Sequence, residues 1–408
     1  MEDETHASLR EQLNGARATA AVEPALEASL NTPLLYVNAV RAAFAEHFGD
    51  DEEFHAMFKD IGIFEATSIA IKAMRYRDMR VASGEVLMDC AHGTVGRRNA
   101  ATCHCFSDSS ALRDVFVRHI GFAELAYEFM PGVLRKELKG MGHELVSHEP
   151  ATGMFEPAYF VSLNASTREL VVSVRGTSSS ADWLTNLFIK PGALALKGEK
   201  PEDCVVHGGM LQAARFLLAR AGQLIRSMSA AGFAVVVVGH SLGGGVATVL
   251  AVILREEVGM RDVRCVAYAA PPAVSRRLAT LARDYVSCIV NGDDVIPRTS
   301  VGSLKNMGAV LARLRALHSE GDWATTLDRQ SFQDLYATAV TLKVEKAFDT
   351  YLPGRVLCVF PHGERSLAME VDAQYPPLRL LALSNRMIAD HSLVAYRAAL
   401  TRAADNID

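Results

Sequence analysis

The sequence lacks features that would assign it to several common classes of protein. Its 408 residues contain no basic block and carry a formal net charge of −5, which argues against nucleic acid as the main partner. No apolar run reaches the roughly 18 residues that a membrane-spanning helix requires. The opening stretch MEDETHASLREQLNG is acidic and polar, so we expect no secretory signal there.

Cysteine is scattered along the chain without a regular pattern. The seven cysteines are an odd number in a long chain, which fits reduced thiols and predicts a cytoplasmic location. A loose cluster lies at Cys90, His92, Cys103, His104 and Cys105, but its spacing matches no common zinc pattern. We therefore predict no metal site in the protein.

Apolar residues, by contrast, are abundant at 50% and allow a sizeable core. We predict a helical extension over residues 1–106, which ends in a connector rich in small residues. A second domain follows over residues 107–408, beginning with a helix from about Ala111 to Leu138. The segment at about 298–350 lacks the alternation of strands and helices seen around it, so we predict a helical insertion there.

The remaining pattern predicts an α/β fold. AYFVSL and ELVVSV, joined by NAST, indicate a β-hairpin. Apolar residues recur at helical spacing from Leu211 to Met228. FAVVVV, VRCVAYAA and YVSCIVN are short apolar runs, typical of strands buried on both faces of a parallel sheet. Late strands at RVLCVF and SLAMEV and a helix from Ser392 complete a mostly parallel sheet with right-handed crossovers.

The most informative motif lies between FAVVVV and a helix predicted over Val246 to Glu257. Residues 239–243, GHSLG, fit the pattern G-x-S-x-G, in which a serine occupies a strained turn and the flanking glycines let strand and helix approach closely. The context of buried strand, turn and helix favours catalysis over a glycine-rich turn without chemistry. Ser241 is therefore the candidate nucleophile, and the backbone N–H of Leu242 is a candidate oxyanion donor.

A serine hydroxyl needs a base to react at neutral pH. In this arrangement the partners follow in the order serine, acid, histidine. Three histidines follow Ser241: His318 in the predicted insertion, His362 in a predicted hairpin turn, and His391 just before the last helix. We favour His391 because a loop after the last strands can return it to the carboxyl edge of the sheet.

The acid should follow a strand that comes after the nucleophile. Asp293 and Asp294 both follow the strand YVSCIVN, and the residues alone leave both open. Asp390 is next to His391 in sequence and would have difficulty orienting it. A second oxyanion donor should come from an earlier loop that follows a strand, and Arg175 to Ser180 supply such a loop.

These residues stand in motifs that resemble the fungal-type, or class 3, lipase family. The likeness covers roughly Phe122 to Ala399 and rests on the ordered stretches VSVRGTSSSADWLTNL, VHGGMLQAA, VVVGHSLGGGVA, VNGDDVIPR and MIADHSLVAY. The resemblance implies an α/β-hydrolase fold and a serine lipase that uses no cofactor. It selects Asp294 and His391 for the triad and places the second oxyanion donor at Thr177.

Within the family the chain resembles the diacylglycerol lipase branch, through YAAPPAVS and YLPGRVLCVF. In that branch the insertion, here Arg298 to Thr350, controls access to the site. Animal members carry four membrane-spanning helices at the N-terminus, and we expect none in this chain because no apolar run is long enough. Trp183, Leu187 and Phe188 fall in a region that forms a lid in secreted relatives, and core packing is the equal alternative.

We therefore expect a serine lipase that hydrolyses carboxylic esters of acylglycerols, with a diacylglycerol-like substrate. The alternatives are a phospholipase or galactolipase, and a lipase-like scaffold without turnover. An amphipathic face near Leu34 to Phe48 leaves open a peripheral attachment to a membrane or lipid-droplet surface. Packing of that face onto the hydrolase core is the simpler use.

Overall fold

A computed structural model describes residues 103–151, 153, 155–176, 191–300, 302–303, 349–362, 365–373, 375–379 and 386–407. The predicted helical extension, apart from its last four residues, and most of the predicted insertion lie outside these ranges. In the described part of the chain, no helix combines the length and apolar character needed to span a bilayer.

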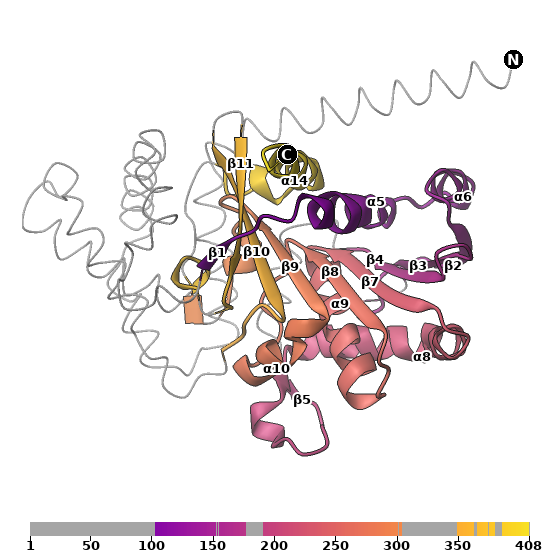
Figure 1. Ribbon diagram of the computed structural model, residues 1–408. Helices are drawn as coiled ribbons and strands as arrows, with labels where there is room; N and C mark the ends of the chain where they lie inside the picture. The colour runs from indigo at the N-terminus through magenta and orange to yellow at the C-terminus, as the bar shows by residue number, and fades with distance from the viewer. Residues whose placement is uncertain are drawn as a thin grey trace, which may run out of the picture.

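Nine of the described strands form one sheet, in the order β1-β11-β10-β9-β8-β7-β4-β3-β2 (Figure 1). Their bounds are β1 Cys103–Cys105, β2 Glu144–Glu149, β3 Tyr159–Asn164, β4 Glu169–Val174, β7 Ala234–His240, β8 Val263–Tyr268, β9 Val286–Asn291, β10 Arg355–His362 and β11 Arg365–Val371. The five central strands β4, β7, β8, β9 and β10 run parallel. This confirms the predicted α/β fold with a mostly parallel central sheet.

Antiparallel strands complete the sheet on both sides of the parallel centre. β3 and β4 form the predicted hairpin, with β2 outside them. On the other side β10 turns back into β11, and β1 pairs with the outer edge of β11. A small separate ribbon joins β5 and β6, which span Gly192–Ala193 and Val205–Val206.

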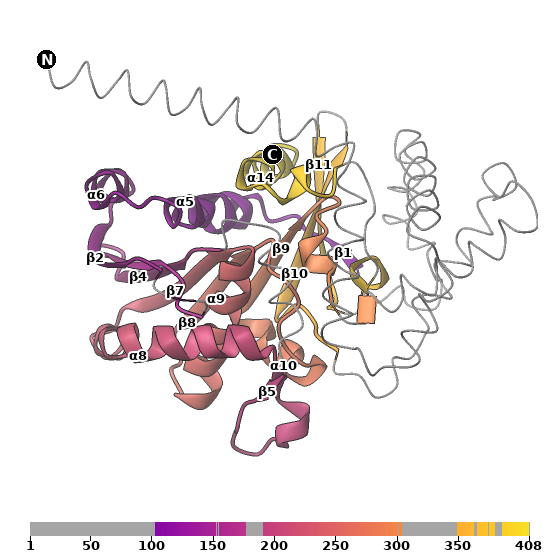
Figure 2. The ribbon, with the colours of Figure 1, turned by 180° about the vertical axis from the view of Figure 1, so that it is seen from behind.

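Helices cover both faces of the sheet, as Figures 1 and 2 show from opposite sides. The helices α8, α9 and α10 lie on one face, and α5 and α14 lie on the other. The bounds are α5 Arg118–Leu125, α6 Pro131–Gly140, α8 Gly208–Ala230, α9 Leu242–Val252, α10 Arg276–Leu281 and α14 Leu393–Asp405. Every central strand is therefore buried on both sides, which explains its continuous apolar sequence.

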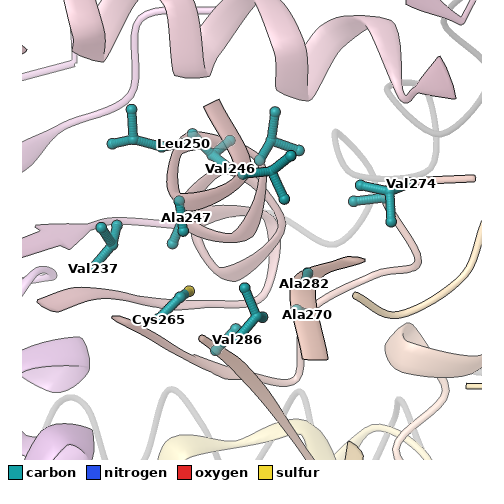
Figure 3. Packing of buried hydrophobic residues seen from close by; sticks show 14 of the residues in the cluster. Val237, Val246, Ala247, Leu250, Cys265, Ala270, Val274, Ala282 and Val286 are labelled. Carbon is teal, nitrogen blue, oxygen red and sulfur yellow. The ribbon is translucent and has the colours of Figure 1, made fainter. Parts of the chain in front are cut away.

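The four consecutive valines of β7 show how one strand serves both layers. Val235 and Val237 pack in the cluster that contains α8 and α9, whereas Val236 and Val238 pack in the cluster that contains α5 and α14. Figure 3 shows the first cluster, where α9 lies over Val237 of β7. Alternate side chains of a strand point to opposite faces, so a buried central strand needs apolar residues at every position.

The structure differs from the predicted elements at three places. The helix predicted from about Ala111 to Leu138 is broken, because a π-helical turn leads into α5 and a new helix, α6, begins at Pro131. Proline has no N–H to donate within a helix, but it suits the first helical position. The predicted connector contains strand β1, and β2 was not predicted. Both are edge strands without a clear apolar alternation.

A compact charged cluster lies away from the carboxyl edge of the sheet. Glu169, the first residue of β4, forms ion pairs with Arg118 of α5 at 2.7 Å and, when the ring is protonated, with His143 at 3.4 Å. Burial raises the pKa of Glu169, but the hydrogen bond from His143 and the charges of His119 and Arg118 outweigh it and hold the pKa at about 2. The cluster thus ties α5 and the loop before β2 to the start of β4.

Candidate active site

The turn between β7 and α9 holds Ser241 in a conformation that few non-glycine residues adopt. Its φ is 57° and its ψ is −131°, in a region of positive φ that costs free energy and persists only where surrounding structure enforces it. A Cβ added to Gly239 would overlap the backbone of Gly243, and one added to Gly243 would overlap the carbonyl oxygen of Val174. The two glycines of the motif therefore permit this sharp turn next to β4.

Two further side chains converge on Ser241 from other parts of the chain. The Nε2 atom of His391 lies 3.0 Å from the Oγ atom of Ser241. The Nδ1 atom of the same ring lies 3.0 Å from both carboxylate oxygens of Asp294. The structure thus brings together the three residues predicted as nucleophile, base and acid, in the geometry that proton transfer from serine to histidine requires.

The sheet and the last helix position these partners. Asp294 follows β9 by three residues, and His391 ends a short 3-10 turn directly before α14. The hydroxyl of Ser392 accepts a hydrogen bond from the N–H of Ala395 at 3.2 Å and caps this helix. The cap fixes where α14 begins, and with it the loop that returns His391 to the sheet.

The carboxylate of Asp294 is fully buried and has protein donors besides His391. The hydroxyl of Tyr396 donates to Oδ2 at 2.7 Å, and the N–H of Ile296 donates to Oδ1 at 2.9 Å. Burial, together with the nearby Asp294 charge, raises the pKa of Tyr396 well above its usual value. The phenol therefore stays protonated and donates, which compensates the carboxylate for the loss of water.

The two aspartates that sequence reasoning weighed against Asp294 contact each other instead. The backbone N–H of Asp293 donates to Oδ2 of Asp390 at 2.8 Å, and Arg386 donates to Oδ1 at 3.0 Å. The side chain of Asn291 donates to the backbone oxygen of Asp390 at 3.0 Å. Burial raises the pKa of Asp390, although the hydrogen bond from the N–H of Asp293 and the charge and hydrogen bond of Arg386 oppose the shift. Asp390 therefore fastens the loop that carries the histidine to the loop that carries the acid.

Leu242 is placed where an oxyanion donor is needed. It is the first residue of α9, so its backbone N–H has no acceptor within the helix and faces the site together with the positive end of the helix dipole. Gly176, after β4, lies against the same turn, because a Cβ added to it would come within 3.3 Å of the Cβ of Ser241. The loop that was predicted to supply the second donor thus starts beside the nucleophile.

Several predicted residues fall outside the described ranges. They are Thr177, the lid candidates Trp183, Leu187 and Phe188, and His318. Cys90 and His92 of the loose cysteine and histidine cluster also lie outside. His362 ends β10 opposite Arg365 of β11, at the hairpin connection where sequence reasoning placed it.

Sequence reasoning missed three contributors to the site: Tyr127, His240 and Tyr396. Tyr396 contacts the acid, His240 contacts the backbone oxygen of His391, and Tyr127 contacts His240. His240 was visible as the variable residue before Ser241 in the motif. Tyr396 lies five residues after His391 in HSLVAY, but nothing in the sequence indicates that its hydroxyl reaches Asp294.

The comparison with known families agrees with this geometry. Residues 171–303, which include β4, the elbow and Asp294, match the family described as Lipase (class 3). Over these residues the chain is similar to the class 3 lipase family. The family match ends before His391, so the assignment of the histidine rests on the geometry alone.

Individual relatives match only part of this chain. Diacylglycerol lipase-beta of Mus musculus is 37% identical over 168 residues, which cover 40% of this chain and 25% of that protein. The secreted mono- and diacylglycerol lipase 1 of Fusarium solani is 32% identical over 148 residues, which cover 34% of this chain and 41% of that protein. The chain thus spans well under half of the length of these two relatives.

A solved structure of the Rhizomucor miehei lipase propeptide complex is also similar to this chain. It has a TM-score of 0.48 and 12% sequence identity, and it covers 73% of this chain and 89% of that chain.

Proposed function

We propose that the protein hydrolyses carboxylic ester bonds of acylglycerols, with diacylglycerol as the substrate class, through an acyl-enzyme on Ser241. The observation that carries the proposal is the Ser241–His391–Asp294 arrangement, with both bridging distances at 3.0 Å. The class 3 lipase match supports ester hydrolysis, and the diacylglycerol lipases among the relatives support the finer substrate class.

The acylation step follows from the positions of the atoms. The Oγ atom of Ser241 attacks the ester carbonyl carbon while Nε2 of His391 takes its proton. Asp294 accepts from Nδ1–H, which holds the reactive tautomer and stabilises the imidazolium that forms. The carbonyl oxygen becomes an oxyanion, which accepts from the N–H of Leu242 and, in this proposal, from the N–H of Thr177.

The remaining steps use the same groups in reverse. The tetrahedral intermediate collapses, the C–O bond to the alcohol breaks, and the imidazolium of His391 protonates the leaving alkoxide. Water then gives a proton to His391 and attacks the acyl carbon. A second collapse returns the proton to Ser241 and releases the fatty acid.

Exposed apolar side chains near these residues support a lipid substrate presented at a membrane or droplet surface. Phe129 and Met130 follow Tyr127 of the site closely and are 65% and 59% exposed. Val394 lies three residues after His391 and is 76% exposed. Large apolar residues at such exposure commonly mark contact surfaces, and their closeness in sequence to the site favours contact with the lipid phase that holds the substrate.

The experiment compares fatty-acid release from dispersed diacylglycerol and from a water-soluble short-chain ester, with Ser241→Ala as the control. We expect release from both substrates, faster from diacylglycerol, and a loss of about 10⁶-fold in the control. Release from the soluble ester alone would refute the acylglycerol assignment while leaving an esterase. Equal release by wild type and Ser241→Ala would refute catalysis by this serine.

A further inference from the structure

Two side chains outside the triad connect it to the loop that follows β4. The Nε2 atom of His240 lies 2.8 Å from the backbone oxygen of His391. The Nδ1 atom of His240 lies 3.0 Å from the hydroxyl of Tyr127, which follows α5. The same hydroxyl lies close to the backbone of Gly176, because a Cβ added to Gly176 would come within 2.6 Å of it. The backbone of the catalytic histidine is thus joined by two hydrogen bonds to Tyr127, which lies against Gly176.

The chemistry of each group sets the direction of this path. A backbone carbonyl oxygen can only accept, so Nε2 of His240 carries the proton and donates to His391. A neutral imidazole then has a lone pair at Nδ1, which accepts from the hydroxyl of Tyr127. Every donor along this path therefore has one acceptor, and no two hydrogen atoms point at each other.

Burial keeps both side chains neutral. It lowers the pKa of His240 to about 3, together with the nearby charge of His391, and it raises the pKa of Tyr127 to about 12. At neutral pH the imidazole of His240 is therefore uncharged and the phenol is protonated. Neutrality matters because the ring centroids of His240 and His391 are 4.7 Å apart. A positive ring at this distance would oppose the imidazolium that forms on His391 during acylation.

The carbonyl oxygen of His391 needs the hydrogen bond that His240 donates. His391 precedes the capping residue Ser392, and the first helical hydrogen bond of α14 goes from Tyr396 to the carbonyl of Ser392. The helix therefore offers no donor to the carbonyl of His391. Because the side chain of His391 is 22% exposed, packing alone holds its ring less firmly than that of a fully buried residue.

We infer that Tyr127 and His240 are positioning residues, which fix the backbone of His391 against the nucleophile turn and couple it to the start of the oxyanion loop. His240 holds the carbonyl of His391 so that the imidazole stays in line with Ser241. Tyr127 holds the tautomer of His240 and, through Gly176, the chain next to Thr177. The inference rests on the proposed function, since it assigns roles relative to the triad reaction.

The alternative role for Tyr127 and His240 is to fill space in the core without positioning His391. The ring of His240 contacts the rings of Tyr127 and Tyr396 edge-on, with centroids 6.0 Å and 6.4 Å apart. Phenylalanine preserves most of this packing at either position and removes only the hydrogen bonds. Tyr127→Phe and His240→Phe therefore separate the two roles, and His240→Gln restores a neutral N–H donor.

The experiment uses the full chain and measures the second-order rate of phosphonylation of Ser241 by a fluorophosphonate, together with kcat and KM on a soluble ester. We expect Tyr127→Phe to lower the phosphonylation rate and kcat by about 3-fold to 10-fold, the effect of one neutral hydrogen bond. His240→Phe should lower both by about 100-fold, as a displacement of about 1 Å at the base would do. KM should stay within about twofold of wild type, because only the base is displaced.

Two comparisons make the test specific. The double variant should react no more slowly than His240→Phe, because Tyr127 acts through His240. His240→Gln should recover part of the loss. A matched control is Tyr285→Phe, which removes another buried phenol at the start of β9, the opposite end of the strand from Asp294. It should leave the phosphonylation rate unchanged.

The outcomes separate this inference from the proposed function. A wild-type protein that does not react with the probe would overturn the proposed function and this inference together. A reactive wild type with an equally reactive Tyr127→Phe variant would overturn the inference alone. Strictly additive losses in the double variant, or a KM that rises in step with the fall in kcat, would also overturn it. If His240→Phe does not fold, the Tyr127→Phe and His240→Gln rates still decide.

Discussion

The close contact between Gly243 and the end of β4 makes Gly243→Ala an informative perturbation. The added Cβ would overlap the carbonyl oxygen of Val174 and lie 2.6 Å from the carbonyl carbon of Arg175. Ordinary contacts of this kind need about 3.4 Å, so the start of α9 and the end of β4 would have to separate by roughly 1 Å. Both partners are backbone, and neither can rotate away.

The expected cost follows from this displacement. Overpacking of a well-packed site costs roughly 1–3 kcal/mol and occasionally more, and a contact between two backbones belongs at the upper end. About 3 kcal/mol corresponds to a fall in Tm of roughly 6–12 °C in a domain of this size. A shift of about 1 Å between Ser241 and the oxyanion loop should also lower kcat/KM by about 100-fold.

The assay combines thermal unfolding with steady-state kinetics on a soluble ester. Gly140→Ala is the matched control, because a Cβ there meets nothing within 4 Å and alanine suits the end of a helix better than glycine. The control should keep its activity and lose no stability. A Gly243→Ala protein with wild-type Tm and wild-type kcat/KM would show that the strand and the helix do not approach as closely as described.

Three further perturbations test other parts of the site and fold. Asp294→Asn should lower kcat by about 10⁴-fold with little change in KM, as measured by steady-state kinetics, because it favours the wrong tautomer of the histidine; a loss below tenfold would contradict the assignment of the acid. Tyr396→Phe should lower the free energy of unfolding by about 1.5–3 kcal/mol in urea titrations, since it removes a 2.7 Å hydrogen bond to a buried carboxylate; an unchanged midpoint would refute that contribution. The pKa of Glu169 is held at about 2, below its unfolded value, so its stabilisation is complete above the unfolded value and is lost as the pH falls from about 4.5 to about 2. Glu169→Gln should remove the fall in the free energy of unfolding that Glu169 causes between pH of about 4.5 and about 2, as measured by urea titrations across that range. An unchanged pH dependence would refute this contribution of Glu169.

The features that the sequence predicts well are local in the chain. The run of valines, the G-x-S-x-G pattern and the apolar helix after it all fall within residues 234–252, and together they predict the turn that holds Ser241. The parallel centre of the sheet follows from buried strands that alternate with helices. Such elements are specified by neighbours in sequence, so a single sequence suffices to recognise them.

The features that escaped prediction depend on contacts between distant segments. The residues alone left both Asp293 and Asp294 as candidates for the acid, because the choice depends on which carboxylate faces a histidine about 100 positions away. Tyr127 reaches His240 across 113 positions, and no periodicity or motif marks it. Pro131 itself indicated that the helix predicted from about Ala111 to Leu138 would be interrupted. The prediction followed the apolar pattern on either side of the proline instead.

The most direct test of a working triad is covalent labelling of the full chain with a fluorophosphonate, followed by mass spectrometry of the labelled peptide. Only a serine activated by a base reacts readily with such a probe. The account predicts one modified residue, Ser241, in the wild type, and a loss of labelling in His391→Ala and Ser241→Ala. Labelling at a different residue, or undiminished labelling in His391→Ala, would contradict the account.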